Sequence, residues 1–229
     1  MNFAYSDRAE FYQDRFVAAS NREPLASLAL YHLLKWSAVS PLLHTYFRLK
    51  IEGAAKVPQS GGLIVVSNHA SYFDPPILSN CVRRPVAFMA KEELFRVPVL
   101  KQVIKLYGAY PVKRSTGDRN ALRAAMTAIE SGWIAAVFLQ GTRSADGKIT
   151  DPKPGAAWIA AKAQVPLLPV SLWGTEKILT KGSAFPRSAP VTVRIGDIIA
   201  PPASTKKIDL ETVTNQCAEA INSLHNLGR

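Results

Sequence analysis

The chain has 229 residues, of which 48% are hydrophobic and 20% charged, and its formal net charge is +11 at pH 7. These values are typical of one well-buried globular domain and argue against a disordered chain. With only Cys81 and Cys217, a disulfide framework or a cysteine-based zinc site is not expected, and a reducing compartment fits. The basic balance favours anionic partners, but no nucleic-acid motif occurs, so nucleic acid is not an expected partner.

The N-terminal region is apolar without the pattern of a signal peptide, because charged side chains are mixed through its first 24 residues. From Leu25 to Phe47 the only full charge is Lys35, and apolar residues occupy nearly every face of a helix. Lys35 would cost about 2.5–3.5 kcal/mol on insertion, and Pro41 would break or kink the helix. We therefore expect membrane-associating apolar helices within residues 1–47, two of them short and lying in the membrane interface. The alternative is that they pack on the domain core.

Beyond Gly53 strand patterns alternate with helical patterns, which predicts an α/β domain with a largely parallel central sheet flanked by helices. We expect this single domain to occupy residues 48–229. The expected strands are Arg48–Ile51, Leu63–Ser67, Pro85–Met89, Ala109–Val112, Ile134–Leu139, Leu167–Leu172 and Val191–Ile195. The expected helices are Pro75–Val82, Val99–Tyr107, Asp118–Ser131, Gly155–Ala163 and Ile208–Leu227.

A polar cluster, NHASYFD at residues 68–74, directly follows the second expected strand. His69 is suited to take a proton near neutral pH, and Asp74 could hold its imidazole in one tautomer and stabilise the cation. Five residues on a helix correspond to about 140° of rotation, so the chain must turn between the two side chains. Asp74 could also cap a helix that begins at Pro75. Taken alone, the pair fits a loop histidine and a helix cap better than it fits catalysis.

Other strand ends carry groups suited to binding an anion. Their cationic and hydrogen-bonding side chains are Lys91, Lys113, Arg114, Gln140, Thr142, Arg143 and Ser144. Arginine grips phosphate through a bidentate fork, and Gly141 would let the backbone approach a ligand closely. In a parallel sheet these strand ends meet at one edge, which favours a shared site over scattered surface charge.

At this point the chain resembles the glycerolipid acyltransferases, in particular the 1-acyl-glycerol-3-phosphate acyltransferases, which make phosphatidic acid. The matching blocks are His69 with Asp74 as the His-x4-Asp signature, residues 108–114, residues 138–144 and residues 165–170. They cover about half of the chain, and the N-terminal helices also resemble membrane-docking helices of some members. The resemblance implies a glycerol-3-phosphate acyltransferase-like fold.

The resemblance also implies a mechanism. His69 would act as general base on the free hydroxyl of lysophosphatidic acid, which attacks an acyl thioester, and Asp74 would orient His69. The donor would be acyl-CoA or an acylated acyl carrier protein, with no cofactor and no metal. The implied location is peripheral or monotopic on the cytoplasmic side of a membrane with anionic lipid. The implied acceptor-binding residues are Lys91, Lys113, Arg114, Gln140, Gly141, Thr142 and Arg143.

Position 140 departs from the family, which more often has Glu there. Gln140 keeps an acceptor oxygen and adds donors, but it can act neither as a base nor as an ion-pair partner of Arg143. We expect activity to survive, with a shifted acceptor preference. One alternative is the same transfer to glycerol 3-phosphate, a lysophospholipid or a lyso-amino lipid. Others are a non-catalytic protein that binds anionic lipid and a hydrolase using Ser71 with His69, although no nucleophile elbow surrounds Ser71.

Overall fold

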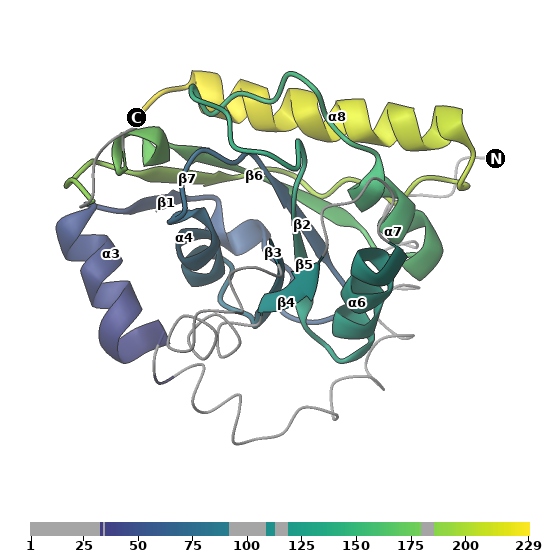
Figure 1. Ribbon diagram of the computed structural model, residues 1–229, viewed down its shortest axis with the longest axis horizontal. Helices are drawn as coiled ribbons and strands as arrows, with labels where there is room; N and C mark the ends of the chain where they lie inside the picture. The colour runs from purple at the N-terminus through teal and green to yellow at the C-terminus, as the bar shows by residue number, and fades with distance from the viewer. Residues whose placement is uncertain (1–32, 34, 92–108, 113–118, 180–185) are drawn as a thin grey trace.

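The computed structural model of the protein describes residues 33, 35–91, 109–112, 119–179 and 186–229. Within them, the strands form one seven-stranded sheet in the order β1-β7-β6-β2-β5-β3-β4 (Figure 1). The strands are β1 (Lys50–Glu52), β2 (Ile64–Ser67), β3 (Val86–Lys91), β4 (Ala109–Val112), β5 (Ile134–Phe138), β6 (Leu167–Trp173) and β7 (Thr192–Ile195).

The sheet is largely parallel, as the alternation of elements predicts. β6, β2, β5, β3 and β4 run in the same direction. β7 is antiparallel to β6, and β1 is parallel to β7, so these two strands run against the rest. The carboxyl ends of the five parallel strands therefore lie at one edge of the sheet, where α/β proteins commonly bind ligands.

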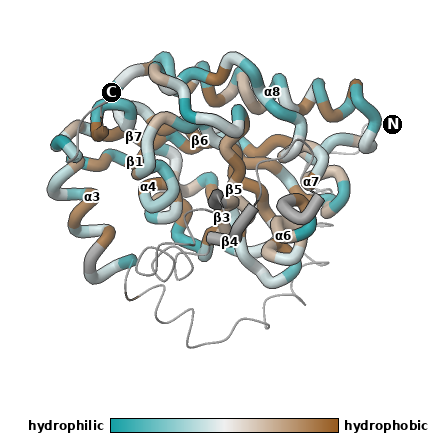
Figure 2. The backbone as a smooth tube through the Cα atoms, viewed as in Figure 1, coloured by the Kyte–Doolittle hydropathy of each residue, from teal (hydrophilic) through white to brown (hydrophobic). Residues whose placement is uncertain are grey.

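Helices cover both faces of the sheet. They are α3 (Ser40–Tyr46), α4 (Asp74–Cys81), α6 (Arg119–Glu130), α7 (Gly155–Ala163) and α8 (Lys207–Asn226), with short turns η2 (Lys35–Val39), η3 (Ala54–Lys56) and η5 (Thr175–Lys177). On the central strand β2, Val65 packs with α3 and α4, whereas Ile64 and Val66 pack with α6, α7 and α8. Because β2 is buried on both faces, it is a continuous apolar run, and the sheet strands are among the most hydrophobic segments in Figure 2.

The predicted elements agree closely with the observed ones. Each predicted strand is present with its ends shifted by at most two residues, and α4, α6, α7 and α8 by at most one. β1 starts at Lys50 instead of Arg48, because Arg48 adopts a left-handed backbone conformation with φ of 46° that a strand cannot contain. The predicted helix Val99–Tyr107 lies outside the described residues.

The described part of the N-terminal segment is helical from Lys35 to Tyr46 and packs on the domain. The π-helix η2 leads directly into α3, and Pro41 is the second residue of α3. Pro41 thus lies beside a change from π- to α-helix, and the chain is helical on both sides of it. Leu43 and Phe47 join the core, whereas no helix among the described residues is long and apolar enough to cross a membrane.

Lys35 is fully buried against α4. Its Nζ donates a hydrogen bond of 2.7 Å to the carbonyl of Ser79, in the last turn of α4, where the helix dipole favours a cation. Burial lowers the pKa of Lys35 to about 8. Lys35, whose charge we expected to oppose membrane insertion, thus connects the N-terminal segment to the domain.

Candidate active site

The site begins where β2 ends, and Asn68 shapes the backbone there. The β2–β6 ladder ends at the pair Ser67 and Val170. Beyond it the side-chain amide of Asn68 replaces the main chain: Nδ2 donates to the carbonyl of Leu172 at 2.8 Å, and Oδ1 accepts from the Leu172 N–H at 2.8 Å. Nδ2 also donates to the carbonyl of Gly147 at 2.7 Å. The backbone can therefore leave the sheet at His69 without leaving the edge of β6 unpaired.

The loop that receives Asn68 is fixed from the other side by α8. His225, buried near the end of α8, donates from Nε2 to the carbonyl of Asp146 at 3.1 Å. Gly147 has a φ of 72°, and a Cβ there would lie 2.7 Å from the His225 ring, so only glycine fits. Sequence reasoning did not select Asn68 or His225. The position of an amide between a strand end and a histidine is the one local signal for Asn68.

Asn68→Asp is expected to destabilise the fold more than Asn68→Ala. Alanine leaves two carbonyls and one N–H unpaired, which costs about 2–4 kcal/mol in unfolding free energy. Aspartate adds a buried charge facing the carbonyls of Gly147 and Leu172, at about 3–5 kcal/mol. Urea unfolding at pH 7 measures both, and Asn215→Asp on the exposed face of α8 is the matched control. Equal stability of wild type and Asn68→Asp would contradict this account of the strand end.

His69 and Asp74 form a hydrogen-bonded pair at the strand end, as their spacing suggested. His69 Nδ1 lies 2.7 Å from Asp74 Oδ2, and the same oxygen accepts the N–H groups of Ala70 and Ser71, each at 2.7 Å. Because an ionised carboxylate only accepts, Nδ1 carries the imidazole proton and Nε2 keeps its lone pair. The Asp74 side chain is fully buried, and the His69 side chain is 12% exposed. Within the described part of the chain, Nε2 has no hydrogen-bond partner.

Asp74 does not cap α4, contrary to the sequence-based expectation. Phe73 is the N-cap residue, Asp74 is already helical, and its carboxylate makes no capping bond. The reason is local: Pro75 and Pro76 have no N–H to offer a capping carboxylate, and the N–H of Ile77 is bonded to the carbonyl of Phe73 at 3.1 Å. Asp74 instead turns back to the N–H groups that precede it. Its orientation is therefore set by the same turn that carries His69.

Two contacts join this turn to the end of β5. The His69 ring stacks on Phe138, the last residue of β5, with centroids 4.0 Å apart and planes within 12°. The N–H of Ser144 donates to the carbonyl of His69 at 2.8 Å. The convergence of these two strand ends, predicted from a parallel sheet, is thus confirmed. Stacking also fixes the plane in which the imidazole can act.

The turn after β5 contains four of the predicted site residues. Gly141 has a φ of 72°, which requires glycine, and it is exposed together with Thr142 and Arg143. The side chain of Gln140 bonds to a nearby loop: its Oε1 accepts from the Thr150 N–H at 2.8 Å and from the Asp151 N–H at 3.3 Å. A glutamate carboxylate could accept the same two bonds, so the Gln–Glu difference is small at this contact.

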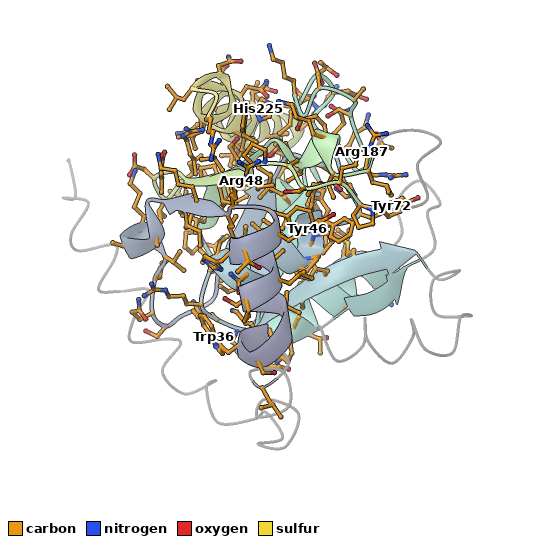
Figure 3. The ribbon with its side chains drawn as sticks, turned by 90° about the vertical axis from the view of Figure 1, so that its left-hand side faces the viewer. Trp36, Tyr46, Arg48, Tyr72, Arg187 and His225 are labelled. Carbon is orange, nitrogen blue, oxygen red and sulfur yellow. The ribbon has the colours of Figure 1, made fainter. Side chains whose placement is uncertain are left out.

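Arg143 is held over the turn that carries His69 and Asp74. Its Nη2 donates to the hydroxyl of Tyr72 at 2.9 Å, and its guanidinium carbon lies 3.7 Å from the centre of the Tyr72 ring. Tyr72 is 60% exposed and is labelled in Figure 3 at the edge of the molecule. Sequence reasoning passed over Tyr72, because a lone aromatic residue in a turn carries no signal of its partner.

The remaining predicted cations are only partly described. Lys91 is the last residue of β3, and its backbone pairs with Val112 at the end of β4, so its position belongs to the same sheet edge. Lys113 and Arg114 lie outside the described residues. Ser71, the nucleophile of the hydrolase alternative, is buried, and its hydroxyl accepts from the Phe73 N–H at 3.3 Å.

His69 and Asp74, the His-x4-Asp signature of the resemblance, thus lie hydrogen-bonded at the carboxyl edge of the parallel strands. A sequence model described as Acyltransferase matches residues 48–173, which include this pair and the turn after β5. The chain therefore belongs to the acyltransferase family.

Individual relatives have more specific descriptions than the family model. The chain is 32% identical over 193 residues to the chloroplastic 1-acyl-sn-glycerol-3-phosphate acyltransferase BAT2 of Brassica napus, covering 82% of this chain and 54% of the relative. It is 27% identical to the 1-acyl-sn-glycerol-3-phosphate acyltransferase of Borreliella burgdorferi, covering 66% and 62%. The chain thus spans about half the length of the curated relatives it matches.

A solved structure agrees with the family assignment. The crystal structure of the 1-acyl-sn-glycerophosphate (LPA) acyltransferase PlsC from Thermotoga maritima superposes with a TM-score of 0.67 at 29% sequence identity. The match covers 86% of this chain and 79% of that chain. The similarity therefore extends well beyond the blocks that carry the motifs.

Proposed function

We propose that the protein transfers a fatty acyl group from an acyl thioester to the free hydroxyl of lysophosphatidic acid, forming phosphatidic acid in phospholipid biosynthesis. The observation that carries the proposal is the 2.7 Å bond between His69 Nδ1 and Asp74, which leaves the Nε2 lone pair available. The relatives named above as 1-acyl-sn-glycerol-3-phosphate acyltransferases support the choice of acceptor.

His69 acts as the general base. Nε2 removes the proton of the acceptor hydroxyl as its oxygen bonds to the thioester carbonyl carbon. The tetrahedral intermediate then expels the thiolate, which takes the proton from the His69 imidazolium. The Asp74 carboxylate stabilises that imidazolium at 2.7 Å. No acyl-enzyme forms, so Ser71 is not needed as a nucleophile.

Arg143 and Arg114 hold the acceptor phosphate, helped by Lys91 and Lys113. Of these, Arg143 supports the proposal by geometry. Among the ion pairs of the described residues, none involves Arg143, so no carboxylate in that part of the chain neutralises its charge. The remaining residues that shape the acceptor site are Gln140, Gly141 and Thr142.

An assay of the purified protein tests the proposal. Lysophosphatidic acid, glycerol 3-phosphate and a lysophospholipid are each offered with acyl-CoA and with acylated acyl carrier protein, and the products are identified by mass. We expect phosphatidic acid as the main product. A larger kcat/KM with another acceptor would favour the alternative in which the same transfer serves that acceptor. Free fatty acid that disappears in Ser71→Ala would instead indicate a hydrolase.

Gln140→Glu is expected to change kcat/KM for lysophosphatidic acid by less than about threefold, as for substitutions that keep their local bonds. Glutamate can still accept the N–H groups of Thr150 and Asp151. Gln140→Ala, which loses both bonds, is the comparison and should lower activity more. A gain of about tenfold or more in Gln140→Glu would show that the native acceptor is not lysophosphatidic acid.

The protein binds peripherally or monotopically to the cytoplasmic side of a membrane. The helical segment of η2 and α3 with Leu33 before it supports membrane contact, because Leu33, Trp36 and Leu42 are each at least half exposed. Figure 3 faces this helical column, with Trp36 at its lower end. The net charge of +11 would add attraction to anionic lipid.

Trp36→Ser combined with Leu42→Ser is expected to weaken binding to anionic phospholipid vesicles by about tenfold or more. Each buried apolar side chain of this size contributes about 1.5–3 kcal/mol when it leaves water. Ile208→Ser on α8, where Ile208 is 66% exposed, is the matched control and should leave binding unchanged. Vesicle sedimentation measures the partition coefficient. Equal losses in the control and the double variant would contradict docking through η2 and α3.

A further inference from the structure

Arg143 is positioned by an aromatic ring. Stacking at 3.7 Å and a hydrogen bond of 2.9 Å both come from Tyr72. A guanidinium presents five N–H donors, and only one of them is used by the Tyr72 hydroxyl. The ring attracts the cation without cancelling its charge, as an acidic partner would. The contact therefore orders the side chain while leaving donors and charge for a dianionic ligand.

Tyr72 belongs to the turn that holds the base. It lies between His69 and Asp74 in the chain, and this turn is fixed by the bonds from Ala70 and Ser71 to the Asp74 carboxylate. The backbone bond from Ser144 to His69 ties Arg143's own turn to the same point. The guanidinium and the imidazole are therefore held by the same turn. The distance between them is set by two independent contacts, that of Arg143 with Tyr72 and the backbone bond from Ser144 to His69.

That distance is relevant to the chemistry of the acceptor. In lysophosphatidic acid the free hydroxyl and the phosphate are on adjacent carbons of glycerol, so a base and a phosphate ligand must be held in register to engage both. An arginine that sampled many rotamers would lose part of its binding energy to ordering, since its long side chain gives up rotamer entropy when it is fixed. Tyr72 orders it before substrate arrives.

We propose that Tyr72 is a positioning residue that fixes Arg143 relative to His69 and so selects acceptors with a phosphate beside the free hydroxyl. The inference rests on the proposed function, because it takes Arg143 as a phosphate ligand. Tyr72 itself need not touch the reacting atoms. Replacing Tyr72 should thus change the KM for the acceptor, and it should have no effect on this KM when Arg143 is absent.

A double-mutant cycle tests the inference. Tyr72→Leu, Arg143→Ala and the double variant are compared with wild type for kcat and for the KM values of lysophosphatidic acid and acyl donor. We expect Tyr72→Leu to raise the KM for lysophosphatidic acid about three- to tenfold, with kcat and the donor KM nearly unchanged. Tyr72→Phe, which keeps the ring, should recover most of the loss. In the Arg143→Ala background, Tyr72→Leu should have little further effect.

The arms separate two kinds of failure. If Arg143→Ala leaves the KM for lysophosphatidic acid unchanged, the phosphate role of Arg143 in the proposed function falls, and the inference falls with it. If Arg143→Ala raises that KM but Tyr72→Leu adds its full effect to it, the inference alone is overturned. Tyr46→Phe is the matched control, since it also removes a tyrosine hydroxyl bond, to the Pro186 carbonyl, and it should leave both KM values unchanged.

Discussion

Replacing His69 by alanine is expected to lower kcat for acyl transfer by about 10²–10⁴-fold, the usual contribution of general acid–base catalysis. The variant loses the imidazole nitrogen Nε2, whose lone pair is available because Nδ1 is bonded to Asp74. The KM for lysophosphatidic acid should change little, since the proposed phosphate ligands are other residues. Initial rates of phosphatidic acid formation at saturating donor measure both quantities.

Loss of activity through misfolding can be separated from loss of the base. Asp74 keeps its bonds from Ala70 and Ser71 when the imidazole is removed, so urea unfolding of His69→Ala should stay close to wild type. His44→Ala is the matched control, because His44 is exposed on α3 and bonds only within its own helix. A loss of less than about tenfold in His69→Ala would reject His69 as the base.

The fold was predictable because its signals are local. The apolar run of β2 shows that this strand is central, since only a strand buried on both faces has no polar alternation. Gly155 and Ala163 bound α7 as predicted, and the carboxyl ends of β2 and β5 had to meet once the sheet was parallel. The reversed direction of β1 and β7 was not predictable, because pairing direction depends on connections and not on composition.

For the candidate site, the sequence indicated His69, Asp74 and the turn after β5, but not the contacts that these residues make. His69 and Asp74 are close in the sequence, and their pairing follows from a turn. Asn68 bonds to Leu172, 104 positions away, and Arg143 bonds to Tyr72, 71 positions away, so no local pattern reports either contact. Lys35 shows the same limit: its charge argued against a membrane-spanning helix, but no local pattern indicated its bond to the carbonyl of Ser79 at the end of α4.

Asp74→Asn is expected to lower kcat by about 10²-fold, which is less than the effect of the equivalent change in the serine protease triad, where the histidine adopts the wrong tautomer at a cost of about 10⁴. Here the N–H groups of Ala70 and Ser71 select the amide oxygen of the new asparagine, so that oxygen still faces His69 Nδ1. The tautomer is kept, and only the negative charge that stabilises the imidazolium is lost.

Asp74→Ala distinguishes orientation from charge, since alanine removes the acceptor of all three N–H groups. We expect a loss of kcat greater than that of Asp74→Asn and, because two backbone donors are left buried and unpaired, a fall in unfolding free energy of about 2–4 kcal/mol. Asp74→Asn should unfold near the wild-type urea midpoint. Wild-type kcat in Asp74→Asn would mean that the carboxylate only holds the turn, and that the imidazolium needs no charge beside it.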